Sequence, residues 1–230
     1  MTKPENRLYL YRMLKNIKLL IFDVDGTLVD SSGVICEAFN GTTLEMGLSQ
    51  ASPDAITPHI GLSLEDMYFN VFGKRLNEDE VLLFYEKFRR IYDEVDIEGE
   101  DQLQPSVVET LEYFINDKQI SVATTKPVAV AEKILAQQGL LRYFSAVFGG
   151  DSVENIKPDP EIVHKNLAEF NVEPHEAVII GDTTLDVLAG KGAGIHTVSV
   201  LTGAHDRATL AEARPDYIIE TLEDLKNIVA

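Results

Sequence analysis

The chain has 230 residues, of which 45% are apolar, and its net charge is −18 at pH 7. That apolar fraction supports a packed core and excludes a disordered chain. The excess of acid excludes a nucleic-acid partner, which needs a basic footprint, and an anionic membrane surface. No apolar run is long enough to span a bilayer.

Residues 1–16 are expected to be an N-terminal extension, an extra turn or short helix packed on the body of the protein. They contain no continuous apolar stretch and no small-residue cleavage site, so they do not resemble a secretory signal. The single cysteine, Cys36, rules out an internal disulfide. These features predict a cytoplasmic protein.

The first predicted element is a buried strand at residues 17–22, because a short apolar run is followed there by turn residues. Residues 31–103 then predict a block of helices. Ser63 stands three residues before Asp66, which is the spacing of a capped helix start, and Gly73 is suited to end that helix. Asn77, followed by acids, predicts the start of the next helix.

From about residue 104 the pattern alternates between short apolar strands and helices. The predicted strands are 119–125, 144–150, 176–182, 194–200 and 216–220, and the predicted helices are 127–138, 159–170, 184–191, 206–213 and 221–229. Such alternation predicts right-handed βαβ units and a parallel sheet. The predicted fold class is therefore α/β, with a Rossmann-like parallel-sheet core (17–30 and 104–230) and an inserted α-helical cap (31–103). We expect the cap to lie over the carboxyl ends of the strands.

Polar side chains stand where the predicted strands of the core end. They are Asp23 and Asp25 after the first strand, Thr124 and Thr125 at the end of the second, Lys157 before a later helix, and Asp182 at the end of a further strand, with Asp186 four residues later. Because the carboxyl ends of parallel strands meet at one edge of a sheet, these groups are predicted to form one site.

The predicted site holds four carboxylates, which repel one another unless a cation lies among them. A hard divalent cation with oxygen ligands, Mg²⁺, relieves that repulsion. A threonine hydroxyl and a lysine ammonium then suit the oxygens of a phosphoryl group. The pattern therefore indicates phosphoryl transfer with an aspartate nucleophile.

Four segments of the chain, DVDGTLVDS, ATTKP, IKPDP and GDTTLDV, resemble in order and spacing the motifs of the haloacid dehalogenase (HAD) superfamily of phosphatases. The resemblance implies that Asp23 attacks phosphorus and becomes an aspartyl phosphate, while Asp25 protonates the leaving oxygen and then activates water. It also implies the binding groups. Asp23, the backbone carbonyl of Asp25 and Asp182 would bind Mg²⁺, Asp186 would complete the acidic set directly or through water, and Thr124 and Lys157 would hold the phosphoryl oxygens.

Within the superfamily, the chain is most similar to the phosphoglycolate phosphatase-like group with a helical cap. The segments IGLSLEDMYFNVFG, TTKPVAVAEKIL and KPDPEIV carry this similarity. Thr125 stands where that group often has asparagine, and it is a further candidate for substrate contact. In the cap, His59 is a candidate contact for a substrate anion, although a lone histidine is more often a structural or surface residue.

The leading interpretation is a Mg²⁺-dependent phosphatase, monomeric or homodimeric, that acts on a small phosphorylated metabolite such as phosphoglycolate. An inorganic pyrophosphatase, a nucleotide phosphatase and a sugar-phosphate mutase are alternatives on the same scaffold. A non-catalytic regulator would be expected to lack one of the motif acids, and none is missing from this sequence.

Overall fold

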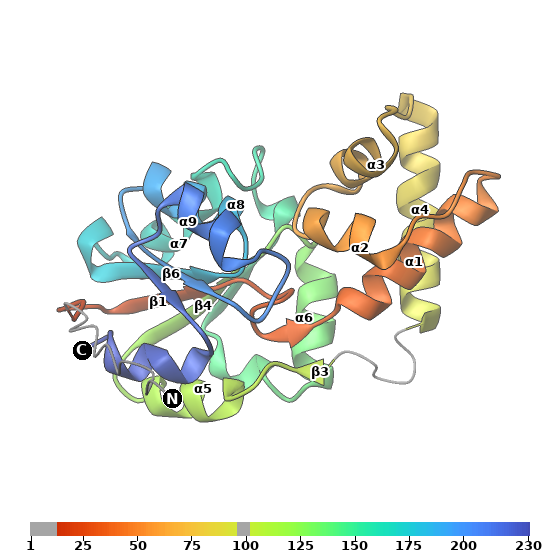
Figure 1. Cartoon of the computed structure of the whole chain (residues 1–230). Helices are drawn as coiled ribbons and strands as arrows, with labels where there is room; N and C mark the ends of the chain where they lie inside the picture. Colours follow the sequence, from red (N-terminus) through yellow and green to blue (C-terminus); the bar gives the residue numbers. More distant parts are fainter. Residues whose placement is uncertain (1–12, 96–101) are drawn as a thin grey trace, which may run out of the picture.

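The computed structural model describes residues 13–95 and 102–230, so most of the expected N-terminal extension and the end of the expected cap lie outside the described residues. Figure 1 shows a layered core on the left and a group of helices on the right. Among the described residues, no helix combines the length and the apolar character needed to cross a membrane.

The core is built on a parallel sheet with six strands in the described part of the chain, in the order β5-β4-β1-β6-β7-β8. The strands are β1 (Leu19–Phe22), β4 (Gln119–Ala123), β5 (Ala146–Phe148), β6 (Ala177–Gly181), β7 (His196–Val200) and β8 (Tyr217–Ile219). Strand β1 lies between β4 and β6, with Phe22 level with Val122 and Ile180. Every residue of β1 is fully buried, because helices cover both faces of a parallel sheet.

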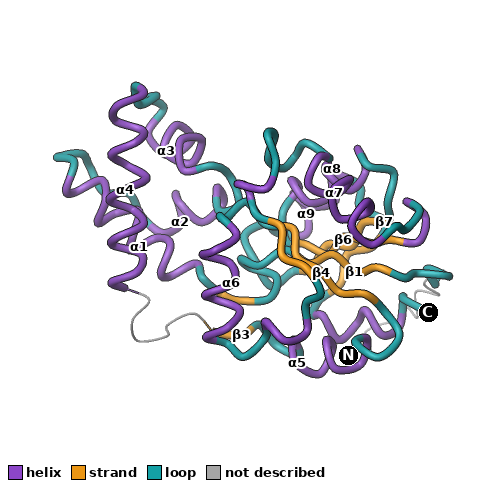
Figure 2. The backbone as a smooth tube through the Cα atoms, turned by 180° about the vertical axis from the view of Figure 1, so that it is seen from behind, coloured by secondary structure: helices purple, strands orange, loops and turns teal. Residues whose placement is uncertain are grey.

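Helices pack on both faces of the sheet, as Figure 2 shows from behind. One face carries α5 (Val107–Phe114), α6 (Val128–Gln137) and the 3₁₀-helix η6 (Leu222–Asn227), and the other carries α7 (Glu161–Phe170) and α8 (Thr184–Gly192), with α9 (Arg207–Ala213) beside α8. Successive residues of β1 face opposite layers: Leu20 and Phe22 join the first apolar cluster, and Leu19 and Ile21 join the second. Short 3₁₀ turns complete the connections of the core at Leu141–Tyr143, Gly150–Ser152 and Pro174–Glu176.

The cap is formed by α1 (Ser32–Glu45), α2 (Pro53–Ile56), the 3₁₀-helix η1 (Thr57–His59), α3 (Leu64–Phe72) and α4 (Glu78–Val95). It has an aromatic centre, in which the ring of Phe39 stacks on Phe72 and meets the edge of Phe84. A short antiparallel ribbon, β2 (Val29–Asp30) with β3 (Gln102–Leu103), joins the two passages of the chain where the cap meets the core.

The local signals in the cap produce the helix ends that were expected of them. The Ser63 hydroxyl accepts a hydrogen bond from the Asp66 amide at 3.1 Å, and Gly73 ends α3 with a φ of 67°. Asn77 and Glu80 exchange side chain to backbone bonds of 2.9 and 3.0 Å at the start of α4. These reciprocal bonds satisfy amides that a helix leaves without partners in its first turn.

The structure also corrects the predicted elements. The last predicted helix, 221–229, is only the short 3₁₀-helix η6, because the following residues pair with Leu14: its amide donates to the Ile228 carbonyl at 2.7 Å. The predicted strand at 144–150 shrinks to the three residues of β5, which is an edge strand beside β4 in the described part of the sheet. The fold class itself, a parallel α/β sheet with a helical cap, is confirmed.

Candidate active site

Asp23 is the first residue after β1, at the carboxyl end of the central strand. Its amide donates to the Ile180 carbonyl at 2.9 Å, so the backbone still follows β6 at this point. The chain then turns through Gly26, whose φ is 72°. A Cβ atom on Gly26 would lie 2.3 Å from a carboxylate oxygen of Asp182, so only glycine fits between the two segments. This turn leaves both Asp23 and Asp25 buried.

Asp182 and Asp186 also lie at this edge of the sheet, but different elements of the structure carry them. Asp182 directly follows β6 and lies outside helix α8, and its two oxygens accept bonds from the Thr27 hydroxyl (2.9 Å) and the Ala204 amide (2.8 Å). Asp186 lies in the first turn of α8, where one of its oxygens accepts bonds from the Thr183 amide (3.1 Å) and hydroxyl (2.6 Å). This capping box aims the carboxylate back towards the strand ends.

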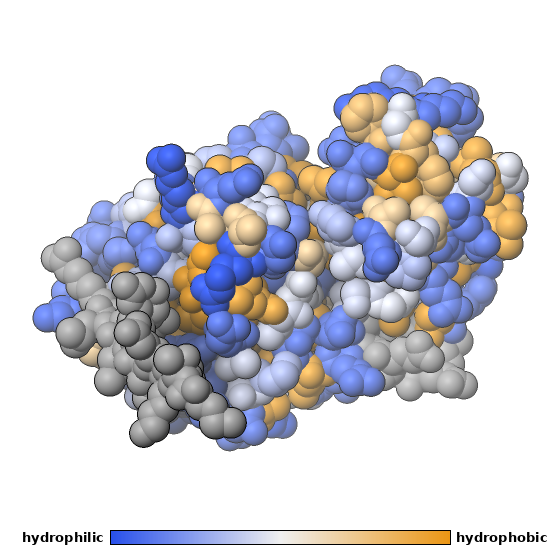
Figure 3. Space-filling model, viewed as in Figure 1, coloured by the Kyte–Doolittle hydropathy of each residue, from blue (hydrophilic) through white to orange (hydrophobic). Residues whose placement is uncertain are grey.

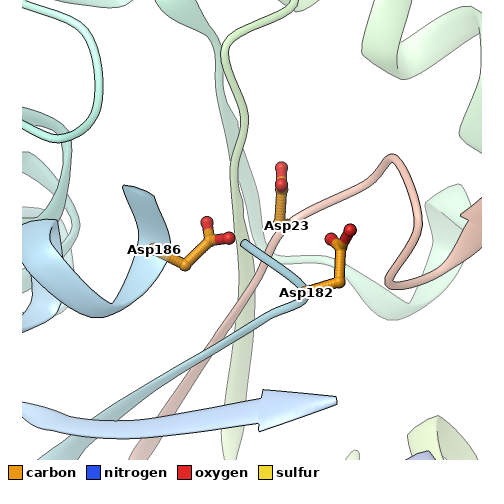
Figure 4. Close-up of side chains that lie close together, drawn as sticks. All are labelled: Asp23, Asp182 and Asp186. Atoms are coloured by element: carbon orange, nitrogen blue, oxygen red, sulfur yellow. The ribbon is translucent and has the colours of Figure 1, made fainter. Parts of the chain in front are cut away.

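The three acids Asp23, Asp182 and Asp186 gather in one buried cluster, in which ligand oxygens from the three lie within 4.8 Å of one another. Figure 4 shows their carboxylates converging at the ends of the strands. The Lys157 ammonium lies 2.6 Å from Asp186 and 3.1 Å from Asp23, and it donates to the Ala123 carbonyl at 3.0 Å. Lys157 and the three acids of the cluster are each less than 5% exposed, so these side chains have almost no contact with bulk water.

The electrostatics of this cluster follow from its burial. Burial raises the pKa of Asp23 to about 7; the Lys157 ammonium opposes this rise, and Asp186 adds to it. Burial, together with Asp23 and Asp186, also holds the pKa of Asp182 well above its usual range. For Lys157, burial alone would lower the pKa, but Asp186 and Asp23 raise it above its ordinary value. The lysine is therefore a permanent cation in the site.

The cluster fits a divalent cation. Three ionised acids and Lys157 sum to −3 + 1 = −2 within a buried volume, which one divalent ion neutralises. Asp182 accepts one bond on each oxygen and keeps lone pairs for a metal, whereas Asp186 already accepts three bonds. An ion would therefore find its better placed direct ligands in Asp23 and Asp182, while Asp186 accepts a bond from Lys157; metal binding by each of the three acids stays a prediction. Binding by the Asp25 carbonyl stays a prediction.

Asp25 lies beside the cluster with partners of its own. One of its oxygens accepts a bond from the Ser31 hydroxyl, and the other lies 2.9 Å from the Lys126 ammonium. The same ammonium lies 5.0 Å from the ring centre of Tyr92 in cap helix α4. Lys126 is not among the site residues predicted from the sequence.

The two threonines lie just past the end of β4, because the strand predicted over 119–125 ends at Ala123. Thr124 is buried, and its hydroxyl accepts a bond from the Lys126 amide at 3.2 Å. Thr125, with Asp25 and Lys126, lines a cavity of about 370 Å³ between the core and the cap. The proposed binding of phosphoryl oxygens by Thr124, and of substrate by Thr125, stays a prediction at these positions.

The proposed contact of His59 with a substrate anion stays a prediction. His59 lies in η1 of the cap, outside the residues that line the cavity, and burial lowers its pKa with a contribution from His205. His205, which the sequence reasoning missed, makes the contact between cap and core here. Its Nδ1 accepts a bond from the Thr184 amide at 3.1 Å, so Nε2 carries the proton and donates to the Pro58 carbonyl at 3.2 Å.

Comparison with known proteins agrees with this geometry. The family model for haloacid dehalogenase-like hydrolases matches residues 20–200. A phosphoglycolate phosphatase of Haemophilus influenzae is 30% identical over 225 residues, which cover 94% of this chain and 100% of that protein. The pyrophosphatase PpaX of Bacillus velezensis is 31% identical over 216 residues, covering 93% and 97%. The crystal structure of a predicted phosphoglycolate phosphatase from Haemophilus somnus superposes with a TM-score of 0.83 at 30% identity, covering 94% and 99%.

Proposed function

The chain belongs to the haloacid dehalogenase-like hydrolases, and we propose that it is a Mg²⁺-dependent phosphatase that cleaves a small organic phosphate through an aspartyl phosphate on Asp23. The observation that carries this proposal is the buried cluster of Asp23, Asp182 and Lys157 at the strand ends, with Asp25 beside it. Such a cluster combines a nucleophile, a divalent-metal site and a fixed cation within reach of one phosphoryl group.

In the first half of the reaction, a carboxylate oxygen of Asp23 forms a bond to phosphorus, and the bond between phosphorus and the leaving oxygen breaks. Asp25 gives a proton to that leaving oxygen, so the product is a neutral alcohol. Lys157, already 3.1 Å from Asp23, offsets negative charge on the phosphoryl oxygens. When bound by Asp23 and Asp182, Mg²⁺ supplies the charge that lets a carboxylate approach a phosphate dianion.

In the second half, a water oxygen attacks phosphorus and Asp25 takes a proton from that water. The bond between phosphorus and Asp23 breaks, which releases inorganic phosphate and restores the carboxylate. Asp25 is held for both proton transfers by Ser31 and Lys126. The relatives include phosphatases of phosphoglycolate and of pyrophosphate, so the leaving group is decided by the cavity beside Asp25.

The test is phosphate release with Mg²⁺ from phosphoglycolate, pyrophosphate, nucleoside monophosphates and hexose phosphates. Asp23→Asn is expected to lower kcat by more than about 10³-fold, because it removes the nucleophile and keeps the side-chain shape. Asp79→Asn, at an exposed acid of α4, is the matched control and should act like the wild type. When the enzyme is quenched in acid during turnover of a substrate that carries a labelled phosphate, the label should remain on the wild-type protein and not on Asp23→Asn.

Two results would contradict the proposal. Turnover retained in Asp23→Asn would exclude Asp23 as the nucleophile, and undiminished turnover in excess EDTA would exclude the metal. A phosphoenzyme that survives in water and passes its phosphate to a sugar phosphate would instead identify a mutase.

A further inference from the structure

The feature that the reaction leaves unexplained is the size and chemistry of the cavity between the core and the cap. Its volume is about 370 Å³, and Asp25, the proton donor of the proposed reaction, lies on its wall. Figure 3 shows the two parts of the molecule meeting with a notch between them at the top of the view. The His205 bond to Pro58 shows that cap and core are in contact around it.

The walls of this cavity are mainly apolar. The cap contributes Ile35, Leu64, Met67 and Phe88, and the core contributes Pro127 and Val130. Charged side chains also line the cavity: three acids, Asp25, Glu86 and Asp93, and two cations, Lys126 and Arg89, which together sum to −3 + 2 = −1. A group that enters the cavity from the phosphorus atom therefore leaves water for walls that are largely hydrocarbon and carry no net positive charge to receive an anion.

The cavity is also larger than the leaving groups suggested by the named relatives. Since a water molecule occupies about 30 Å³ of liquid, the cavity has room for roughly a dozen waters. Glycolate, a two-carbon acid, would fill only part of that space. Phosphate, the leaving group of pyrophosphate, would bring further negative charge to largely apolar walls that carry no net positive charge, which is costly.

The charge of the cap points the same way. Between residues 32 and 103 there are five Lys and Arg against fifteen Asp and Glu, so the segment carries 5 − 15 = −10. Such a cap repels a second anionic group on the leaving side of the substrate. Apolar burial, by contrast, is favourable whatever the charge of the surroundings.

We infer that the leaving group of the physiological substrate is an uncharged alcohol with an extended apolar body, aliphatic or aromatic, and not glycolate or phosphate. This inference rests on the proposed phosphatase function and names the substrate class of the same site. The apolar body lies between α3, α4 and α6, and its ester oxygen lies at Asp25.

The first test is a series of n-alkyl phosphates from ethyl to hexyl, assayed beside phosphoglycolate and pyrophosphate with Mg²⁺. The basicity of the leaving alcohol is nearly constant along the alkyl series, so a trend in kcat/KM reports burial and not leaving-group chemistry. We expect kcat/KM to rise about three- to fourfold for each methylene that enters the cavity. A flat series, or a preference for phosphoglycolate or pyrophosphate over hexyl phosphate, would overturn the inference.

The second test fills the cavity. Val130→Phe places a ring into it from α6, so hexyl phosphate should lose more than about tenfold in kcat/KM while ethyl phosphate is hardly affected. Leu82→Phe is the matched control, because Leu82 is 70% exposed on α4 and does not line the cavity. Met67→Ala enlarges the same cavity and should shift the preference towards longer chains. An equal loss on both esters in Val130→Phe, with unchanged preference in Met67→Ala, would place the leaving group elsewhere.

Failure of this inference is distinguishable from failure of the proposed function. If Asp23→Asn abolishes hydrolysis of every ester but the alkyl series is flat, the reaction stands and the substrate class is wrong. If no ester is hydrolysed, or Asp23→Asn remains active, both are wrong.

Discussion

Asp23 must be ionised to attack phosphorus, yet its surroundings favour the protonated form. Burial raises its pKa to about 7 from an ordinary value of 3.8, and Asp186 and Asp25 add to the rise that Lys157 opposes. A divalent cation at Asp23 and Asp182 would favour the ionised form of both acids. Metal binding and nucleophilicity are therefore linked at a single side chain.

This link predicts how the stability of the metal-free protein depends on pH. Between pH 3.8 and about 7, folded Asp23 keeps a proton that the unfolded chain has lost, so the free energy of unfolding falls as pH rises through that window. The loss is at most about 4 kcal/mol. Asp23→Asn cannot ionise, so in EDTA it should be more stable than the wild type at pH 8 and similar to it near pH 4.

Urea unfolding at several pH values measures this directly. Asp79→Asn, an exposed acid, should keep the pH dependence of the wild type. Mg²⁺ at pH 8 should raise the stability of the wild type more than that of Asp23→Asn. Parallel pH curves for the wild type and Asp23→Asn would show that burial does not oppose ionisation of this carboxyl.

The residues of the cluster were predictable because the fold brings strand ends together. Asp23 and Asp182 directly follow strands, Lys157 precedes a helix, and Asp186 lies in the first turn of one, so the parallel sheet is enough to bring them together. Lys126 was missed because its role depends on a contact with Asp25, which approaches from another strand. A contact between two residues that are far apart in the sequence produces no local pattern from which it could be predicted.

At the scale of helices and strands, features set by neighbouring residues were predicted, and features set by contacts between distant segments were not. The ends of α3 depend on residues close in sequence, Ser63 with Asp66 at the start and Gly73 at the end. They can therefore be predicted from the local sequence. The shortening of the last helix depends on Leu14, more than two hundred residues away in sequence, so no local pattern reports it. Likewise, nothing near His205 indicates that its ring joins α8 to the cap.

His205 provides a prediction about how the cap is held. Replacing it with alanine removes one bond to the start of α8 and one to the Pro58 carbonyl, while stability should fall by only about 1 kcal/mol. Cap and core should then separate more often, so we expect KM to rise severalfold with a smaller change in kcat.

Amide hydrogen exchange tests the structural part of this prediction. Exchange in residues 57–62 should become faster in His205→Ala, while the strands of the core stay protected. His205→Gln, which keeps an acceptor and a donor, should recover part of both effects. Unchanged exchange in residues 57–62 would show that this contact does not hold the cap.

At the scale of the whole molecule, a net charge of −18 surrounds a site that must accept a phosphate dianion. The distant charges repel the substrate during its approach, but they contribute little once it lies beside Lys157 in the buried cluster. Salt screens the first effect and leaves the second, since the Debye length falls from about 30 Å at 0.01 M to about 8 Å at 0.15 M.

We therefore expect KM for a dianionic phosphoester to fall about two- to fivefold between 10 and 150 mM KCl, with kcat unchanged. Mg²⁺ must be kept saturating at every salt concentration, because screening also weakens its attraction to the acidic protein. Most enzymes that bind anions through a basic surface show the reverse, since salt screens an attraction. A KM that rises with salt would mean that Lys157 and Lys126 set the field at the mouth of the site, and that the acidic surface lies too far away to influence binding.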